Sequence, residues 1–178
     1  MIFTTHYASP LGDVLLAAEK DALIGLWLEG QKYFLGTVKE EQKEEETPVL
    51  KEAKRWLDAY FAGARPEISA LNLAPRGSAF QKTVWKLLCE IPYGEVTTYK
   101  TVAEKTARVL GRPSMSAQAV GGAVGHNPIS IIIPCHRVVG TGGSLTGYAG
   151  GLEKKIRLLT LEGVDMGRFF LPKSSTAP

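Results

Sequence analysis

The sequence predicts a small α/β N-terminal half, with one sheet and one helix, followed by a mostly α C-terminal half with a helix-turn-helix. Short apolar runs separated by turn residues fill the first thirty positions, and helical spacing of apolar residues recurs after residue 48. The charge changes sign near residue 75: residues 1–75 carry 8 basic and 12 acidic side chains, whereas residues 76–178 carry 13 and 6. A chain of 178 residues suffices for one ordinary domain or two small ones.

In the first half, three apolar runs predict strands, at residues 2–7, 14–18 and 23–28. The turn residues Ser9-Pro10-Leu11-Gly12 follow the first strand, and a spacer of hairpin length joins the other two. We expect the glutamate-rich run 39–46 to be a solvated loop or the start of a helix. A helix should begin at Thr47 and Pro48, because proline lacks only an N–H that would be unpaired in the first turn.

In the second half, three helices are predicted in succession. Ser78 and Gln81 form a capping box for the first helix, which ends at Pro92-Tyr93-Gly94. Its apolar face consists of Phe80, Val84, Leu87, Leu88 and Ile91. Thr98 caps the second helix, residues 99–110, and the third runs from about residue 115 to 125. Two helices, a turn and a third helix in a basic region resemble a helix-turn-helix.

The third helix contains interior glycines, each of which costs a helix about 1 kcal/mol relative to alanine. We expect Ala117, Val120, Gly121 and Val124 to face inward. The outer face would then hold Gln118, Ala119, Gly122, Ala123 and Gly125. Such a helix allows another surface to approach its backbone closely, and either a neighbouring helix or a DNA groove fits this requirement.

The composition excludes several classes of protein. Hydrophobic residues at 44% and charged residues at 22% exclude a disordered or fibrous chain, and two cysteines exclude a disulfide scaffold. The first residues lack the pattern of a signal peptide, and no apolar run approaches the roughly 18 residues of a membrane span. We therefore expect a cytoplasmic protein. The net charge of +7 after residue 75 suggests a polyanion partner, although a basic surface without a partner is the alternative.

The candidate chemical site lies at Cys135. Residues 129–133 are predicted to form a buried strand that ends at Pro134 and Cys135, and a cysteine fixed in this way can be a nucleophile or simply a core residue. Adjacent side chains on an extended backbone point to opposite sides, so a bridging water between Cys135 and His136 is the easier geometry. No closely spaced pairs of Cys and His predict a metal site.

Four segments resemble a known family. They are Asn127–Gly140, which contains Pro134-Cys135-His136-Arg137, together with Ile91–Tyr99, Ala119-Val120-Gly121 and Leu145–Leu152. On these motifs the sequence resembles the alkylguanine-DNA alkyltransferases, also called methylated-DNA–protein-cysteine methyltransferases. The likeness covers about residues 78–163, and the first half is compatible with the family's small ribonuclease-H-like domain.

The change of charge and pattern between residues 62 and 76 predicts a domain boundary there, and the resemblance implies a function for each part and a partner. Residues 1–75 would form the α/β scaffold domain, and residues 76–172 the DNA-binding and alkyltransferase domain. We expect residues 173–178 to be a disordered tail. The expected partner is double-stranded DNA containing alkylated guanine, bound by a monomer without a cofactor.

The resemblance also implies direct repair. The protein would rotate the damaged guanine out of the stack and move the alkyl group from its 6-oxygen to Cys135. A thioether is stable, so each molecule would act once. His136 would activate Cys135 through a water, Glu162 would orient His136, and Asn127 would brace the active-site turn.

Further roles are carried over to the pocket, which would be formed by Tyr99, Val138, Tyr148, Ala149 and Gly150. The Tyr99 hydroxyl would donate to the guanine, and the tyrosine would rotate the phosphate of the nucleotide. The carbonyls of Cys135 and Val138 would accept from the guanine amino group, while the Ala149 amide would approach the 6-oxygen.

The residues expected to contact DNA are Thr98, Arg112, Gln118, Ala119 and Gly122. Many members of the family carry arginine directly before Ala-Val-Gly, where it fills the gap left by the flipped base. Here that residue is Gln118. Either Gln118 fills the gap through its own amide, or Arg112 or Met115 contributes.

Three other functions are compatible with parts of the sequence. An alkyltransferase-like protein would recognise damaged DNA without repairing it, but such proteins lack the active cysteine. A plain helix-turn-helix regulator would prefer one operator sequence and gain nothing from alkylated guanine. A thiol hydrolase would cleave small esters.

Overall fold

The computed structural model describes residues 1–172 and divides the chain into two compact units. Residues 1–76 and 128–132 form the first unit, and residues 77–127 with the chain from 133 onward form the second. The tail expected at residues 173–178 lies outside the described residues. Within residues 1–172, no helix is long and apolar enough to cross a membrane.

The first unit contains a four-stranded sheet in the order β3-β2-β1-β4. Its strands are β1 (Ile2–Ser9), β2 (Gly12–Glu19), β3 (Ala22–Leu28) and β4 (Gln42–Glu44). The first three pair antiparallel through short turns, which confirms the three predicted strands. A 3₁₀ turn, η1 (Ile68–Ala70), follows later in the unit.

Strand β4 corrects the expectation of a loop or helix start at residues 39–46. It pairs parallel to β1, with Ile2 opposite Gln42 and Thr4 opposite Glu44. All three β4 residues are exposed, so main-chain pairing alone holds them at the sheet edge. A short, charged edge strand also resists pairing with other chains. Hydrophobic alternation, the usual signal of a strand, is absent because neither face of β4 is buried.

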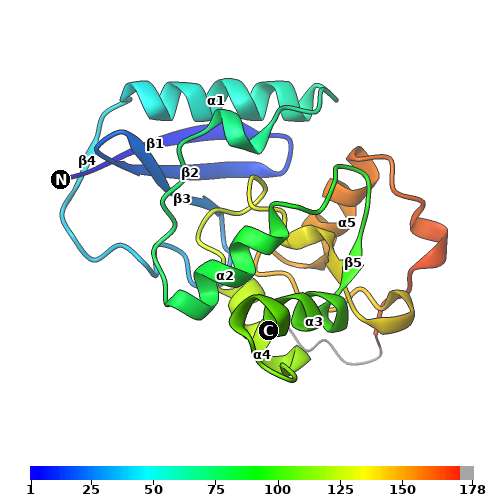
Figure 1. Ribbon diagram of the computed structural model, residues 1–178. Helices are drawn as coiled ribbons and strands as arrows, with labels where there is room; N and C mark the ends of the chain where they lie inside the picture. Colours follow the sequence, from blue (N-terminus) through cyan, green and yellow to red (C-terminus); the bar gives the residue numbers. More distant parts are fainter. Residues whose placement is uncertain (173–178) are drawn as a thin grey trace. The chain divides into compact units, whose positions relative to one another are not determined.

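Helix α1 (Pro48–Phe61) lies along the sheet, as Figure 1 shows, and contacts β1, β2 and β3. It begins as predicted, with Thr47 as N-cap and Pro48 at the first position, although the Thr47 side chain makes no capping hydrogen bond. Its buried residues are Val49, Leu50, Ala53, Trp56, Leu57 and Tyr60. Their spacing of three and four residues places them on the face that packs against the strands.

The buried strand predicted at residues 129–133 does not form. All five residues are buried, but only Ile129 makes a bridge, an isolated one with Leu26. The backbone then turns at Ile131, whose φ of 69° lies in the left-handed region and ends any extended path. Burial was therefore predicted correctly and the conformation was wrong, because a short apolar run alone does not specify a strand.

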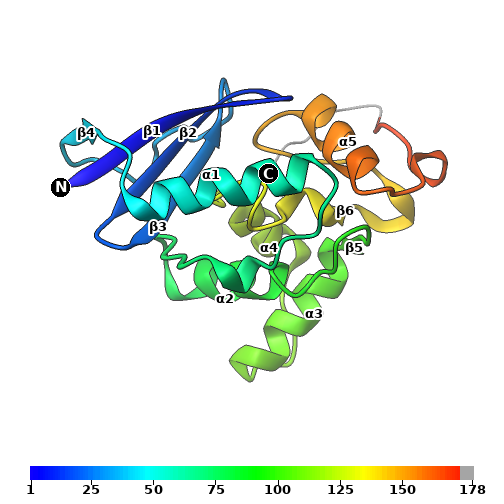
Figure 2. The same ribbon diagram turned by 90° about the horizontal axis from the view of Figure 1, so that it is seen from above.

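The second unit is mostly helical. Its helices are α2 (Ala79–Leu88), α3 (Tyr99–Leu110), α4 (Ala117–Gly125) and α5 (Leu152–Leu161). Its strands are β5 (Thr97–Thr98) and β6 (Val138–Val139), and its 3₁₀ turns are η2 (Cys135–Arg137), η3 (Thr141–Gly143) and η4 (Met166–Arg168). Helices α2, α3 and α4 pack on one another, as Figure 2 shows. The buried Trp85 of α2 fixes α4, because its indole N–H donates to the Ala123 carbonyl at 2.7 Å.

Helix α4 begins two residues later than predicted. The Ser116 side chain accepts hydrogen bonds from the amides of Gln118 and Ala119, so the cap sets the start at Ala117 rather than at residue 115. Its faces also differ from the prediction. Ala117 is exposed rather than inward, whereas Ala123 and Gly125 are buried rather than outward.

We expect Ser78→Ala to lower the free energy of unfolding by about 1 kcal/mol. Ser78 closes a complete capping box with Gln81, with hydrogen bonds of 3.1 and 2.9 Å. Thr47→Ala is the matched control, because Thr47 is also an N-cap but its hydroxyl caps nothing. Urea unfolding of both variants measures the difference. Equal losses would show that the hydrogen bonds of the box contribute nothing.

Candidate active site

Cys135 opens the 3₁₀ turn η2 and is only 4% exposed. The expectation of an extended backbone at Cys135 and His136 is therefore wrong, since both residues lie in a helical turn. Asn127 braces this turn from the end of α4: its side-chain amide donates to the Ile133 carbonyl at 2.8 Å and also bonds the Cys135 thiol. The amide and the thiol thus hold one another in place.

A short parallel ladder brings Tyr99 to this turn. Thr97 pairs with Val138 and Thr98 with Val139, so β5, which leads into α3, lies beside β6, which leaves η2. Thr98 caps α3, and its hydroxyl oxygen accepts from the Thr101 amide at 3.1 Å. The first residue of α3 is Tyr99, and burial raises the pKa of its phenol, which a negative charge on a Cys135 thiolate raises further. Tyr99 is consequently a proton donor across the physiological pH range.

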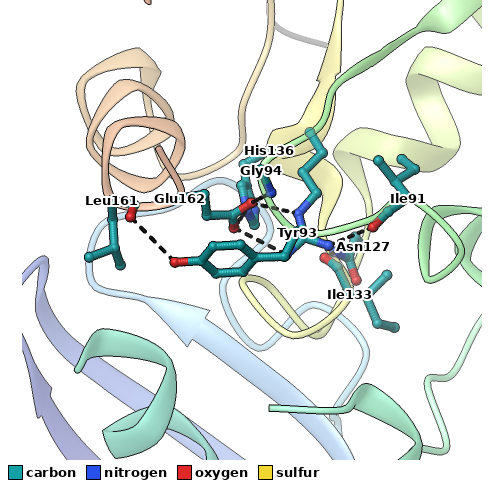
Figure 3. Close-up of polar contacts among 9 residues, drawn as sticks. Ile91, Tyr93, Gly94, Asn127, Ile133, His136, Leu161 and Glu162 are labelled. Atoms are coloured by element: carbon teal, nitrogen blue, oxygen red, sulfur yellow. Dashed lines mark hydrogen bonds and ion pairs between the residues drawn. The ribbon is translucent and has the colours of Figure 1, made fainter. Parts of the chain in front are cut away.

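His136 and Arg137 both contact Glu162 at the C-terminal end of α5, as Figure 3 shows for His136. His136 Nε2 lies 2.7 Å from Glu162 Oε2, and Arg137 Nε donates to Oε1 at 2.8 Å. The side chains of His136 and Glu162 are fully buried. Burial alone would raise the pKa of Glu162, but its hydrogen bonds to His136 and Arg137 outweigh this and hold the pKa well below its usual range.

The carboxylate of Glu162 determines the tautomer of His136. Burial lowers the pKa of His136, so the imidazole is neutral and carries one proton. An ionised carboxylate only accepts hydrogen bonds, so that proton resides on Nε2. Nδ1 is then a buried acceptor, and it has no hydrogen-bond partner among the described residues. It is available as a base on the side away from Glu162.

The thiol of Cys135 is protonated in the resting protein. Burial raises its pKa, while the Asn127 hydrogen bond, the charge of Lys155 and nearby backbone N–H groups act in the opposite direction. A thiolate is the nucleophilic form, so reaction at Cys135 requires a base. The candidate base is the Nδ1 atom of the adjacent His136, which has no hydrogen-bond partner among the described residues.

The turn that follows α2, at Tyr93 and Gly94, is hydrogen-bonded to the C-terminal end of α5. The Gly94 amide donates to Glu162 Oε1 at 3.2 Å, and the Tyr93 hydroxyl donates to the Leu161 carbonyl at 3.3 Å (Figure 3). Gly94 has a φ of 80°, and a Cβ there would lie 3.0 Å from the Glu162 carbonyl oxygen. Glycine is therefore required by both conformation and space.

Lys155, on α5, is fully buried. Its ammonium donates to the carbonyls of Val138, Thr146 and Gly147 at 2.6, 2.9 and 3.0 Å. These three contacts tie β6 to the segment that precedes Tyr148. Tyr148 itself is 5% exposed, and its ring lies edge-on to His136 with centroids 6.4 Å apart. Ala149 and Gly150, which follow, are half-buried.

The exposed surface of α4 holds Gln118 and Ala119, with Gly122 half-buried. A Cβ added at Gly122 would meet no atom within 4 Å, so no neighbouring helix requires a glycine there. The alternative of close packing against another helix is therefore not supported at this position. Arg112 and Met115 lie before α4 and line a cavity of about 450 Å³ along α3.

Comparisons with known proteins cover both units. Residues 2–75 match the 6-O-methylguanine DNA methyltransferase, ribonuclease-like domain, and residues 79–164 match the DNA binding domain of the same family. The methylated-DNA–protein-cysteine methyltransferase of Methanosarcina barkeri is 45% identical over 168 residues, which cover 86% of this chain and 92% of the relative. The chain belongs to the 6-O-methylguanine DNA methyltransferase family. The predicted fold class is thereby confirmed: a ribonuclease-like α/β domain and a mostly helical DNA-binding domain.

Other members of the family agree with this placement. The methylated-DNA–protein-cysteine methyltransferase of Haemophilus influenzae is 39% identical over 163 residues, covering 92% of this chain and 87% of the relative. The structure of the Mycobacterium tuberculosis O6-methylguanine methyltransferase superposes with a TM-score of 0.76 at 39% identity, covering 98% and 97% of the two chains. A structure of the Mycobacterium tuberculosis enzyme in complex with DNA gives a TM-score of 0.77 at 38% identity, covering 94% of each.

The family site is assembled from residues far apart in the sequence. The structure brings together Asn127, Cys135, His136 and Glu162, and places Tyr99 at the same turn. It leaves Arg112 and Gln118 exposed, and within residues 1–172 no side-chain hydrogen bond or ion pair joins either of them to that group. Sequence reasoning missed Arg137 and Lys155.

Both missed residues have a recognisable signal. Arg137 belongs to the quoted motif Pro134-Cys135-His136-Arg137, directly after the histidine. Lys155 occupies an apolar position of α5, four residues before the buried Leu159. A charged residue in the buried stripe of a helix indicates a paired or functional group.

Proposed function

We propose that Cys135 is the residue that receives the alkyl group from O6-alkylguanine in double-stranded DNA. The observation that supports this assignment is a buried thiol directly followed, in the turn η2, by a neutral and buried His136 whose Nδ1 has no hydrogen-bond partner among the described residues. Glu162 fixes the tautomer and orientation of His136, and Asn127 braces the turn. For Cys89, the other cysteine, burial raises the pKa to about 11.

The reaction is an in-line displacement at the alkyl carbon. His136 Nδ1 takes the thiol proton through a bridging water, and the Cys135 sulfur attacks the carbon. The C–S bond forms as the bond between carbon and the guanine 6-oxygen breaks, and the electron pair passes into the base. Guanine regains one proton on N1, which balances the proton lost by the thiol. Tyr99 donates a hydrogen bond to the base and lowers the cost of the developing charge.

Binding involves rotation of the damaged nucleotide out of the duplex. Unstacking costs a few kcal/mol, and less for a mispaired modified base. In this proposal Thr98, Ala119 and Gly122 contact the DNA. Gln118 lies at the exposed start of α4, where it fills the gap left by the base, and the exposed Arg112 is the alternative residue for this role.

The pocket that receives the base is formed by Tyr99, Val138, Tyr148, Ala149 and Gly150. The Val138 carbonyl accepts from the guanine amino group, and the Ala149 amide approaches the 6-oxygen. The thioether is stable, so each molecule acts once. We propose a cytoplasmic monomer that needs no cofactor.

Intact mass spectrometry after mixing with O6-methylguanine duplex DNA tests this function. We expect a gain of one methyl group per molecule, mapped by peptide digestion to the fragment that contains Cys135. Unmodified guanine DNA is the control and should give no gain. A methyl group on Cys89, or turnover beyond one equivalent, would contradict the proposal. Tight binding without any transfer would favour an alkyltransferase-like sensor instead.

A further inference from the structure

The ammonium of Lys155 has three donors, and each points at a backbone carbonyl. Val138, Thr146 and Gly147 supply the acceptors, at 2.6 to 3.0 Å. The side chain is fully buried, and among the described residues no carboxylate pairs with it. A buried cation without a carboxylate partner is costly, so its retention requires an explanation.

Two of these carbonyls are shared with Tyr99. The Tyr99 hydroxyl lies 3.1 Å from the Thr146 carbonyl and 3.4 Å from the Gly147 carbonyl, which are also two of the three Lys155 acceptors. The Lys155 ammonium lies 6.0 Å from the centre of the Tyr99 ring. One hydroxyl proton cannot serve both the protein carbonyls and the substrate. Tyr99 must leave these carbonyls before it can donate to a guanine.

We propose that Lys155 is a positioning residue that keeps the Thr146 and Gly147 carbonyls paired when the Tyr99 hydroxyl turns to the flipped guanine. This inference rests on the proposed function. Without Lys155, the departure of Tyr99 would leave two carbonyls without a donor, and an unpaired buried acceptor carries a free-energy penalty. The hydroxyl would then remain on the protein.

The third contact gives Lys155 a second effect on the same pocket. A carbonyl oxygen has two lone pairs, so the Val138 carbonyl can accept from Lys155 and from the guanine amino group together. The ammonium thereby fixes the direction of this carbonyl. It also ties β6 to the segment 146–147, which directly precedes Tyr148.

Charge state provides a signature of this role. Burial lowers the pKa of Lys155 to about 8, and the charge of Cys135 acts in the opposite direction. The other titratable groups near Lys155 are Tyr99, through its ring, and His136, whose pKa the lysine charge lowers. Below pH 8 the ammonium keeps all three donors, and above pH 8 it loses one. The transfer rate of the wild-type protein should therefore show a falling limb above pH 8.

Single-turnover transfer from O6-methylguanine duplex DNA tests the proposal, with Lys155→Met, Lys155→Arg and the neighbouring Lys154→Met as control. We expect Lys155→Met to lower the transfer rate at saturating DNA on the order of 100-fold, the cost of misplacing a reacting group by about 1 Å. The DNA concentration for half-maximal rate should change less than threefold. Lys155→Arg keeps a charge that does not titrate here, so its residual rate should lack the falling limb above pH 8.

Each outcome is decisive. A Lys155→Met protein that transfers at the wild-type rate would overturn the inference while leaving the proposed function intact. A wild-type protein that transfers nothing to Cys135 would overturn the proposed function itself. If Lys155→Met fails to fold, the pH profile of the wild-type protein still decides, with thermal unfolding followed across the same range. A rate that stays constant from pH 7.5 to 9.5 would contradict the role of the ammonium.

Discussion

Cys135→Ala is expected to abolish alkyl transfer while leaving the affinity for DNA within about threefold of the wild-type value. The reaction forms a bond to the Cys135 sulfur, and no other atom at the turn can replace it. The thiol is only 4% exposed, so removal of one sulfur atom should change the binding of DNA little. Transfer of a radioactive methyl group from O6-methylguanine duplex DNA measures the first quantity, and fluorescence anisotropy with the same duplex measures the second.

The matched control is Cys89→Ala. Cys89 is half-buried at the end of α2, and burial raises its pKa to about 11, so it is almost entirely protonated at neutral pH. We expect this variant to accept one methyl group per molecule at the wild-type rate. Methyl label on the Cys135→Ala protein, or loss of label on the Cys89→Ala protein, would show that Cys135 is not the residue that accepts the methyl group.

Glu162→Ala is expected to lower the free energy of unfolding by about 3–5 kcal/mol, the range for breaking a buried ion pair by removing one partner. Glu162 is 3% exposed, and its loss would leave the guanidinium of Arg137 without its carboxylate. It would also remove the acceptor that holds the Nε2 proton of His136, so transfer should slow in whatever protein still folds. Urea unfolding at neutral pH measures the stability.

A double-mutant cycle separates the ion pair from general damage to the site. Arg137→Ala leaves the buried Glu162 carboxylate without its cationic partner, although His136 and the Gly94 amide still donate to it. The double variant Arg137→Ala/Glu162→Ala removes both charges. The double variant should lose less stability than the two single variants together, by about 1–3 kcal/mol. Simple additivity would mean that the two side chains do not stabilise each other.

The acid dependence of stability has a defined sign. The pKa of Glu162 is lower in the folded protein than in the unfolded chain, where a glutamate titrates at about 4.3. The stabilisation is therefore complete above that pH and disappears as the pH falls through the folded pKa. The gap in stability between wild-type protein and Glu162→Ala should narrow below about pH 4.

Most of the helices could be predicted because their ends carry local chemical signals. The capping box at Ser78 and the cap at Thr98 mark the starts of α2 and α3 to the residue. The fold failed to follow the prediction where the signal was not local. Residues 129–133 are mostly apolar, which indicates burial but not a strand. The left-handed turn at Ile131 could not be predicted, because the position holds neither glycine nor asparagine.

The candidate site was predicted through motifs rather than through geometry. The pairing of His136 with Glu162 joins residues 26 positions apart, and no spacing rule connects them. Resemblance to a family supplied that pair. The resemblance did not point to Lys155. Its partners are backbone carbonyls, and every residue has one, so the sequence does not show which residues Lys155 contacts.

The two-residue ladder between β5 and β6 has a consequence for how the molecule acquires its chemistry. Thr97 and Val138 lie 41 positions apart, so the ladder cannot form until the chain between them has become compact. Closing so long a loop costs entropy before any contact compensates for it. Helices α2, α3 and α4 can form early from local contacts, while Tyr99 and Cys135 come together late. A nascent chain that ends before β6 would contain every DNA-facing residue proposed for α4 and would still lack the strand that places Tyr99 beside the turn of Cys135.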